Sequence, residues 1–310
     1  MKRAHTFFLL LSANFLISGD WPEFRGPDAQ GNAGAIDLPI EFGPEKNLKW
    51  KVAVPGAGWS SPVILDGRIY LTTANVRGAG LSLAALCLDA RTGRMVWNQT
   101  LFSVIKSPRM HRKNSQASPT PIVKGQRLFV HFGHMGTACL DLNGKPIWKN
   151  DTIKYPPVHG NGGTPVLVNG KLIFSCDGAS NPFVIALNAQ TGKTVWRTPR
   201  KTNAKKKFSF STPLVVKFGD KTQVLLPGSN MIGAYDHESG KEIWRITYNG
   251  YSVIPRPVAG RTGCRGRRQT EPHRWCATGP ALRRRWFRRR VPLGLVAVWD
   301  WSRCRGGLLL

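Results

Sequence analysis

The segment Asn188-Ala-Gln-Thr-Gly192-Lys-Thr-Val-Trp196 decides the fold, because the chain repeats it. Asn or Asp followed by Thr-Gly or Ser-Gly is typical of a turn, in which the side-chain oxygen bonds local backbone and the glycine adopts a positive φ. The Val-Trp that follows is typical of a strand with an inward-facing ring. Three further copies, each with an interval of four from glycine to tryptophan, are Asp89–Trp97, Asp141–Trp148 and Asp236–Trp244.

The tryptophans recur at intervals of 47 to 51 residues, counted from Trp50. A period in this range indicates a propeller or a solenoid. Each period also contains an opening strand such as Thr164-Pro-Val-Leu167, a glycine turn with a second strand, and a third apolar strand. Four short antiparallel strands without helical spacing are typical of a propeller blade. The sequence therefore predicts an all-β protein, an incomplete β-propeller of four four-stranded antiparallel blades plus the start of a fifth. The blades are predicted at residues 55–101, 117–151, 163–199 and 211–247.

Residues 46–54 resemble the outermost, tryptophan-bearing strand of a blade. We therefore expect them to form a strand whose three companions come from the C-terminus and close the ring. A ring of about eight such blades needs roughly 380 residues. The repeat pattern instead stops near Gly260, early in the fifth blade, which predicts a truncated ring with uncovered strand edges.

The basic residues of this 310-residue chain, whose formal charge is +28, are unevenly distributed. Residues 1–260 contain 19 Lys and 13 Arg against 15 acidic residues, whereas residues 261–310 contain 13 Arg, no Lys and two acidic residues. A surface selected for solubility or phosphate contact usually mixes Lys with Arg. A nucleic-acid-binding arm, a membrane-surface segment and an out-of-frame or disordered tail compete as interpretations of 261–310. We prefer the last, which also explains the abrupt break in the repeats, and expect no blade strands there and no nucleic-acid partner.

The N-terminus begins with basic residues, continues with an apolar run over residues 7–17 and then has small residues before Asp20. This order predicts a secretory signal peptide over residues 1–19, cleaved near Gly19. A transmembrane helix needs about 20 apolar residues, so no transmembrane segment is expected. The sequence therefore predicts export to the periplasm or the extracellular space.

The phrase Thr-Gly-x-x-x-Trp at the end of each blade, with Ser-Pro-Val or Thr-Pro-Leu opening the next, resembles the pyrroloquinoline-quinone-like (PQQ-like) propeller repeat. The resemblance covers residues 20–260, and the opening Asp20-Trp-Pro-Glu-Phe-Arg-Gly-Pro-Asp28 is similar to the lead-in of exported bacterial members. Members include quinoprotein alcohol dehydrogenases and a non-catalytic scaffold lipoprotein of the outer-membrane assembly machinery. The resemblance implies that tryptophans dock between adjacent blades. The blade-docking residues predicted on this basis are Trp50, Trp97, Trp148, Trp196, Trp244, Gly93, Gly144, Gly192 and Gly240.

The repeats offer no catalytic or metal site, and PQQ follows only from the family resemblance. A quinoprotein enzyme would need a carboxylate cluster for Ca²⁺, a catalytic Asp and often an adjacent Cys pair. Asp89, Asp141 and Asp236 are already assigned to turns, where they bond local backbone. The cysteines of the repeats are isolated, which favours buried small hydrophobic roles. They are Cys87, Cys139 and Cys176.

Histidines and basic loops are the remaining candidates for function. His131 and His134 could ligate a metal, but an i, i+3 spacing on a strand points them to opposite faces, so we expect structural or surface roles. The glycine-rich segment His159–Gly163 lacks the strand-to-helix setting of a phosphate site and is predicted to be a wide turn at a blade entrance. Ser103–Gln116 and Lys201–Lys207 are predicted to be basic loops, either contact surfaces or solvated loops.

We therefore predict an exported PQQ-like propeller that acts as a non-catalytic binding or scaffold module, with a protein as its partner. The alternative is a fragment of a PQQ-dependent quinoprotein alcohol dehydrogenase. The sequence identifies neither the partner nor a substrate.

Overall fold

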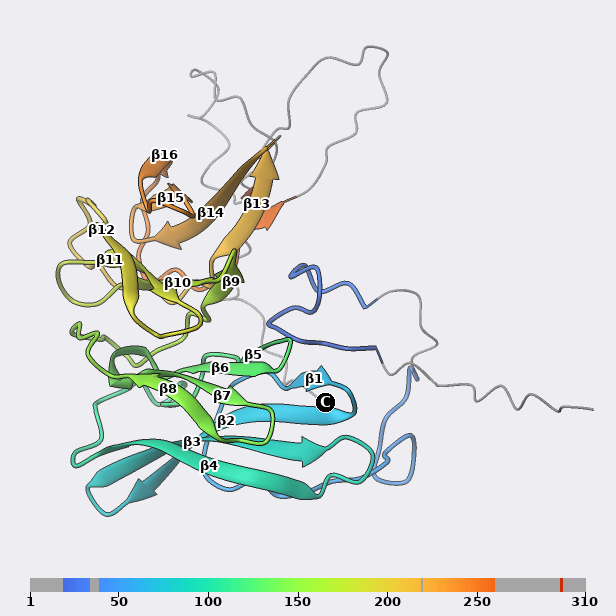
Figure 1. The fold of residues 1–310 in the computed structure, drawn as a ribbon. Helices are drawn as coiled ribbons and strands as arrows, with labels where there is room; N and C mark the ends of the chain where they lie inside the picture. The colour runs from blue at the N-terminus through green and yellow to red at the C-terminus, as the bar shows by residue number, and fades with distance from the viewer. Residues whose placement is uncertain (1–18, 34–38, 219, 260–295, 298–310) are drawn as a thin grey trace, which may run out of the picture.

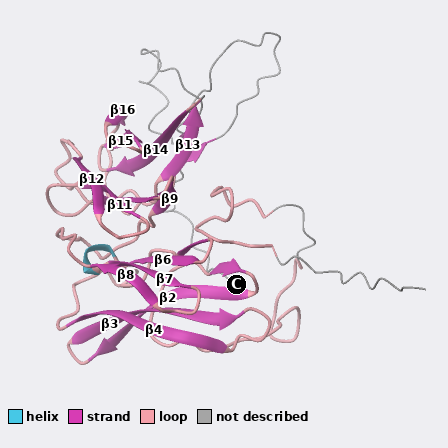
Figure 2. Ribbon diagram, in the orientation of Figure 1, coloured by secondary structure: helices cyan, strands magenta, loops and turns pink. Residues whose placement is uncertain are grey.

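The computed structural model describes residues 19–33, 39–218, 220–259 and 296–297. Four four-stranded antiparallel sheets make up these residues, each with its strands in chain order (Figure 1). The helical content of the described residues is one 3-10 turn, η1 (Gly133–Met135) (Figure 2). No helix within those ranges is long and apolar enough to cross a membrane. The predicted all-β architecture of four blades and the start of a fifth is confirmed.

Each blade is a meander whose first strand lies near the centre of the arc of blades and whose fourth strand lies at its outside (Figure 1). The first two blades comprise β1 (Val63–Leu65), β2 (Arg68–Arg77), β3 (Gly80–Asp89), β4 (Met95–Val104), β5 (Ile122–Lys124), β6 (Arg127–His131), β7 (Thr137–Asp141) and β8 (Pro146–Asn150). The next two comprise β9 (Val166–Val168), β10 (Lys171–Cys176), β11 (Phe183–Asn188), β12 (Thr194–Pro199), β13 (Leu214–Phe218), β14 (Lys221–Gly228), β15 (Met231–Asp236) and β16 (Glu242–Thr247).

The fifth blade begins with β17 (Val258–Ala259), which pairs antiparallel with β18 (Val296–Ala297). Within residues 261–310, predicted to form no blade strands, the structure describes only this two-residue pairing. An open strand edge offers unpaired backbone groups to any short segment of β-prone residues, and β18 pairs with such an edge. The rest of the tail predicted over 261–310 lies outside the described residues, as does the signal peptide predicted over 1–19 except for Gly19.

The hydrophobic core lies in the seams between blades. Each of three clusters combines buried side chains of two neighbouring blades: the first with the second, the second with the third, and the third with the fourth. Alternate residues of the inner strands point into the two seams that flank a sheet, so β3, β7 and β11 are buried along almost their whole length. Full burial of a large apolar side chain contributes about 1.5–3 kcal/mol, so the seams hold the blades together.

Four of the repeat tryptophans contact the turn between the third and fourth strands of the following blade. The indole nitrogens of Trp50, Trp97, Trp148 and Trp196 donate to the carbonyl oxygens of Ala90, Leu142, Ala189 and His237 at 3.0, 3.0, 3.0 and 3.2 Å, respectively. The turn glycine lies against each ring, and all four glycines have a positive φ. A Cβ added at Gly93, Gly144, Gly192 or Gly240 would lie within 2.8 Å of the neighbouring ring. Trp244 differs, because its indole nitrogen donates to Gln223 Oε1 of its own blade at 2.9 Å.

A β-bulge follows each of these turns, between the third and fourth strands of every blade. In the third blade, for example, Ala186 pairs with Trp196 and Leu187 pairs with Thr194, so Val195 has no partner. The extra residue is the Val or Ile that precedes each tryptophan, and its side chain is about 45% exposed in each blade. These residues are Val96, Ile147, Val195 and Ile243, at 44, 46, 45 and 46%. The bulge lets the tryptophan face the seam while its apolar neighbour faces solvent.

The strand expected over residues 46–54 does not form. Gly43 and Lys46 make an isolated bridge with each other, and within the described part of the chain no backbone hydrogen bond joins residues 47–54 to a strand. A fourth strand needs a third strand beside it for its hydrogen bonds, and none lies beside this segment. Trp50 nevertheless contacts the turn of the first blade as the other repeat tryptophans contact theirs.

At the centre of the arc, the Ser-Pro or Thr-Pro pair that opens each blade links it to the next. The amide of Ser61 donates to Thr120 Oγ1 at 3.1 Å, and the amide of Thr120 donates to Thr164 Oγ1 at 2.9 Å. The amide of Thr164 donates to Thr212 Oγ1 at 3.1 Å. The threonines are buried, so this chain of bonds satisfies polar groups that the first strands would otherwise leave unpaired.

Residues 20–31 occupy the same centre. Trp21 exchanges two backbone hydrogen bonds with Ile64 of β1, at 2.8 and 2.9 Å, and the carbonyl of the next residue accepts from Val123 of β5 at 2.8 Å. The buried Arg256 guanidinium donates to two carbonyl oxygens of this segment, at 2.9 and 3.1 Å, and to one before β13 at 2.9 Å. The segment therefore links the first two blades to the start of the fifth.

Candidate functional site

The two ends of the blades are built differently. The tight turns between first and second strands and between third and fourth strands lie at one end, here called the turn end. The turn end comprises residues 66–67, 89–94, 125–126, 141–145, 169–170, 188–193, 220 and 236–241. The connections between second and third strands and between blades lie at the other, here called the loop end. The loop end comprises residues 55–61, 77–80, 105–121, 132–136, 151–165, 177–182, 200–213, 229–230 and 248–257.

The charge of the two ends differs as well. The loop end contains twelve Lys and Arg residues against two acidic residues. The turn end contains five against six, and ten against seven when the residues directly flanking its turns are included. Both basic segments identified in the sequence, Ser103–Gln116 and Lys201–Lys207, connect blades and so lie at the loop end. The excess of positive charge is therefore larger at the loop end.

The interblade loops of the loop end contact one another through aromatic and histidine rings. His111 lies edge to face against His159 with ring centroids 5.5 Å apart, and His159 lies likewise against Phe208 at 5.3 Å. Phe208 in turn lies against Tyr251 at 5.9 Å. We call this set of four rings, each from a different interblade loop, the ring ridge. Edge-to-face packing is favourable for aromatic rings, so the ridge holds the four loops in one surface.

Backbone contacts reinforce this surface. The amide of His111 donates to the carbonyl oxygen of His159 at 3.2 Å, the amide of Phe210 donates to Val253 at 2.7 Å, and the amide of Ser252 donates to Phe208 at 3.2 Å. The predicted wide turn at His159–Gly163 is part of it. Loops tied to a rigid scaffold in this way are common carriers of binding function.

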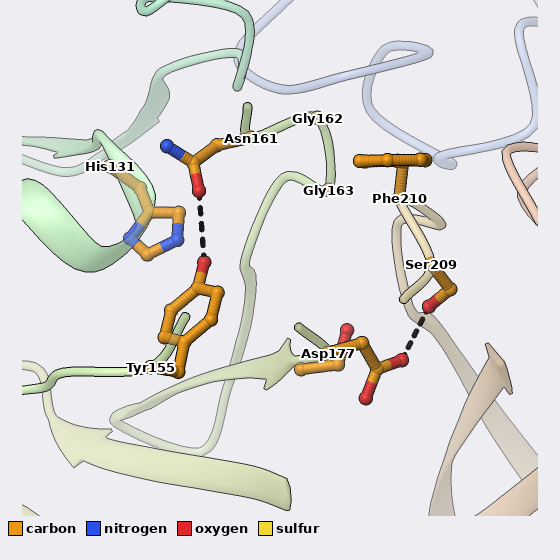
Figure 3. A pocket seen from close by; sticks show the side chains of 9 residues that line it. His131, Tyr155, Asn161, Gly162, Gly163, Asp177, Ser209 and Phe210 are labelled. Atoms are coloured by element: carbon orange, nitrogen blue, oxygen red, sulfur yellow. Dashed lines mark hydrogen bonds between the residues drawn. The ribbon is translucent and has the colours of Figure 1, made fainter. Parts of the chain in front are cut away.

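A polar cavity opens beneath this surface, between the second, third and fourth blades. It measures about 10 Å³, the room that one water molecule requires. The strand ends contribute His131 from β6 and Asp177 directly after β10, and the interblade loops contribute Tyr155, Asn161 and Ser209 (Figure 3). Tyr155 points to Asn161, and its hydroxyl donates to Asn161 Oδ1 at 3.0 Å.

Asp177 and Arg200 form a fully buried ion pair beside this cavity. Arg200 Nη1 and the Ser209 hydroxyl both donate to Asp177 Oδ2, and Arg200 Nη2 donates to the carbonyl of Leu226 at 2.8 Å. Among the described residues, Asp177 Oδ1 and Arg200 Nε have no hydrogen-bond partner. Burial raises the pKa of the Asp177 carboxyl, against the opposing effects of Arg200 and Ser209. The site is therefore a neutral pair beside the cavity, with one carboxylate oxygen that could accept from a water or another small donor.

The two histidines singled out in the sequence are not on one strand. β6 ends at His131, and His134 lies in η1, so the expectation of opposite strand faces is wrong. His131 Nδ1 bonds the Thr137 hydroxyl at 2.8 Å, and burial, followed by the effect of His134, lowers the pKa of His131 to about 3. The His134 ring packs edge to face on Tyr155 with centroids 6.0 Å apart. His131 is therefore neutral at physiological pH and serves the packing of the cavity wall.

The carboxylates of the described residues do not fit a metal-dependent quinone site. Asp89, Asp141 and Asp236 accept hydrogen bonds from backbone amides of their own turns, at 2.8 to 3.1 Å. Asp177 accepts hydrogen bonds from Arg200 and Ser209. In the described ranges no three His, Cys, Asp or Glu side chains converge as a hard cation requires. The arrangement can bind and hold a partner, and we derive no catalytic step from it.

The predicted docking residues and this candidate site lie at different places. All docking tryptophans except Trp244 contact a docking glycine in the outer seams at the turn end, whereas the cavity is at the loop end. Sequence reasoning missed Asp177, Arg200 and Tyr155. One signal was present, because Asp177 and Arg200 carry opposite charges and directly follow two strands of the same blade.

The repeats determine which known proteins this chain is similar to. Residues 44–175 and 180–267 match the family described as outer membrane protein assembly factor BamB. The chain belongs to this family. The BamB of Burkholderia pseudomallei is 23% identical over 232 residues, which cover 71% of this chain and 54% of the relative. The lanthanide-dependent methanol dehydrogenase of Methylorubrum extorquens is 31% identical over 153 residues, which cover 44% of this chain and 24% of the relative.

Among solved structures, the quinohemoprotein alcohol dehydrogenase from Comamonas testosteroni aligns with a TM-score of 0.48 and 14% identity, over 66% of this chain and 38% of that one. The predicted kinship with PQQ-like repeat propellers is confirmed by the family match. The chain spans only 24 to 54% of the length of these two curated relatives.

Proposed function

We propose that this chain is an exported propeller that binds a protein partner through its loop end. The observation that carries the proposal is the union of four interblade loops into one basic surface over a scaffold of packed blades. Membership in the family described as an outer membrane protein assembly factor supports it, and export rests on the signal peptide proposed over residues 1–19.

The loop end has the chemistry of an interaction surface. Alongside its basic residues it exposes large apolar side chains, of which Trp59 is 64% exposed, Ile254 60%, Tyr251 52% and Met110 44%. Aromatic side chains and Met are enriched in protein interfaces. Exposed apolar groups on a rigid, charged surface favour a protein partner.

Site-specific photocrosslinking in cells of the source organism tests this function. A photoreactive residue at His111 or Tyr251 is expected to join the chain to another protein. The matched controls are Lys193 and Lys241, which are exposed at the turn end. Crosslinks of equal yield from the two ends, or only from the turn end, would contradict the proposal.

A second candidate, a quinoprotein alcohol dehydrogenase fragment, is favoured by the 31% identity to the methanol dehydrogenase over the matched residues. When bound, PQQ with a metal ion would supply the redox chemistry of alcohol oxidation. The carboxylates described above do not fit such a site. Dye-linked alcohol oxidation by the purified chain with added PQQ and Ca²⁺ or a lanthanide would establish this candidate instead.

A further inference from the structure

We infer that the loop end binds an acidic segment of the partner protein, laid in extended form along the ring ridge. The inference rests on the proposed function and adds the chemistry of the partner to it. Three features of the described residues carry it: the shape of the ridge, the charges beside it and the apolar side chains at its two ends.

Three rings of the ring ridge are exposed, those of His111, His159 and Tyr251, and the buried Phe208 ring packs against the last two. Successive ring centroids lie 5.5, 5.3 and 5.9 Å apart, and the rings fix one another by edge-to-face packing. An extended chain advances about 3.3 Å per residue, so at most about five residues match the path of the rings. A rigid surface of this kind orders few of its own groups when a segment binds, which limits the entropic cost of binding.

Positive charges adjoin the ridge residues in the sequence, and one of them contacts a ridge ring. Arg112 and Lys113 directly follow His111, and the run Lys205–Lys207 directly precedes Phe208. The Lys206 ammonium lies 4.4 Å from the centre of the Tyr251 ring and 3.2 Å from its hydroxyl oxygen, so it is held on the ridge. Carboxylates of the partner would complement these charges and speed its association.

Exposed apolar side chains stand at the two ends of the ridge. Met110 precedes His111 and approaches Gly160, next to His159. Ile254 follows the strand-like contacts that join Ser252 and Phe210 to their neighbouring loops. Aliphatic groups gain most from burial against other apolar side chains, which an acidic peptide can supply and a nucleic acid supplies poorly. The partner is therefore an acidic segment that also carries apolar residues.

Fluorescence anisotropy with short labelled peptides tests the inference on the purified full chain, at about 0.15 M salt. The probe is a peptide of alternating Glu and Leu, and the comparison peptide has Gln in place of Glu. We expect the Gln peptide to bind at least about tenfold more weakly. The double variant Lys205→Glu/Lys206→Glu should weaken the Glu peptide about tenfold, while its matched control at the turn end, Lys193→Glu/Lys241→Glu, should not change binding.

The alternatives give different results. Equal binding of the Glu and Gln peptides, or no binding of the Glu peptide, overturns the inference, and loop-end crosslinks to a protein would then still support the proposed function. Tighter binding of a single-stranded oligonucleotide or of phosphatidylglycerol vesicles than of the Glu peptide also overturns it. The proposed function itself fails if the loop end yields no protein crosslink, or no more than the turn end yields.

Discussion

The turn end and the loop end belong to the same blades, yet their sequences and contacts differ. At the turn end every blade has an Asx turn whose glycine contacts a tryptophan, and the turn of the second blade is one residue shorter than the others. At the loop end each connection differs in length and sequence, and basic residues prevail. The comparison teaches that the repeat specifies how blades pack, while the segments that interrupt the repeat specify what the propeller contacts.

The largest expected effect on stability is at the buried ion pair of Asp177 and Arg200, which lies at the loop end. Asp177→Ala leaves the Arg200 charge buried without its partner, and we expect it to lower the free energy of unfolding by about 3–5 kcal/mol. Urea denaturation followed by fluorescence measures this. The double variant Asp177→Leu/Arg200→Met should recover much of the loss. A cost equal to that of Asp236→Ala, at an exposed turn, would show that the pair carries no burial penalty.

The next prediction tests whether the contact between glycine and tryptophan at the turn end stabilises the fold. Gly192→Ala places a Cβ 2.5 Å from the Trp148 ring at a φ of 70°, and we expect a loss of about 3 kcal/mol from strain and overpacking. Gly170→Ala is the matched control, with a φ of 71° but no atom within 4 Å, and should cost about 1 kcal/mol. If the two variants cost the same in urea denaturation, the tryptophan contact is not what requires glycine.

The repeat was predictable from sequence because its chemistry is local. A turn glycine and a strand tryptophan at fixed spacing determine blade number, blade bounds and the seams. The bulge at Val195 and its equivalents was not predictable, because it depends on how the third strand pairs with the fourth. Residues 46–54 were predicted as a strand from their tryptophan alone, although a strand also requires a neighbour.

The candidate site depended on contacts far apart in sequence. Asp177 and Arg200 are separated by a hairpin, and the ring ridge joins loops from four interblade connections. The basic character of two loops was visible in the sequence. The meander order of the strands then places both loops at the same end of the propeller. The contacts between the loops could be found only from the structure. The match of the family to residues 44–175 and 180–267 likewise reports the repeats and not the loop contacts.

An intermediate effect is expected at the centre of the arc, between the two ends. Burial lowers the pKa of Arg256 to about 10, and the guanidinium donates three hydrogen bonds that link residues 20–31 to the last described blade. Arg256→Met should cost about 2 kcal/mol, because it leaves those carbonyls without a donor. Limited proteolysis should then cut within residues 20–33 faster than in the unchanged protein. An unchanged cleavage rate would show that the segment is held by its β1 and β5 contacts alone.

A smaller, pH-dependent effect concerns His131 in the cavity wall. Its pKa falls from 6.5 to about 3 on folding, so between these values the unfolded chain binds a proton that the folded chain does not. Above about pH 6.5, His131 should therefore not change the free energy of unfolding with pH. Below about pH 6.5, it should lower the free energy of unfolding by about 1.4 kcal/mol per pH unit. Urea midpoints of the unchanged protein and of His131→Leu, compared between pH 7.5 and 5, isolate this contribution. Parallel pH curves would contradict it.

Charge reversal at the two ends, followed by binding to the crosslinked partner, tests the central claim most directly. Lys205→Glu/Lys206→Glu and Lys193→Glu/Lys241→Glu change the charge equally and lie on exposed surfaces, so each should alter stability by no more than about 0.5 kcal/mol. We predict that the loop-end pair lowers the affinity for the partner about tenfold and that the turn-end pair leaves it unchanged. Equal losses, or a loss confined to the turn-end pair, would contradict the assignment of binding to the loop end.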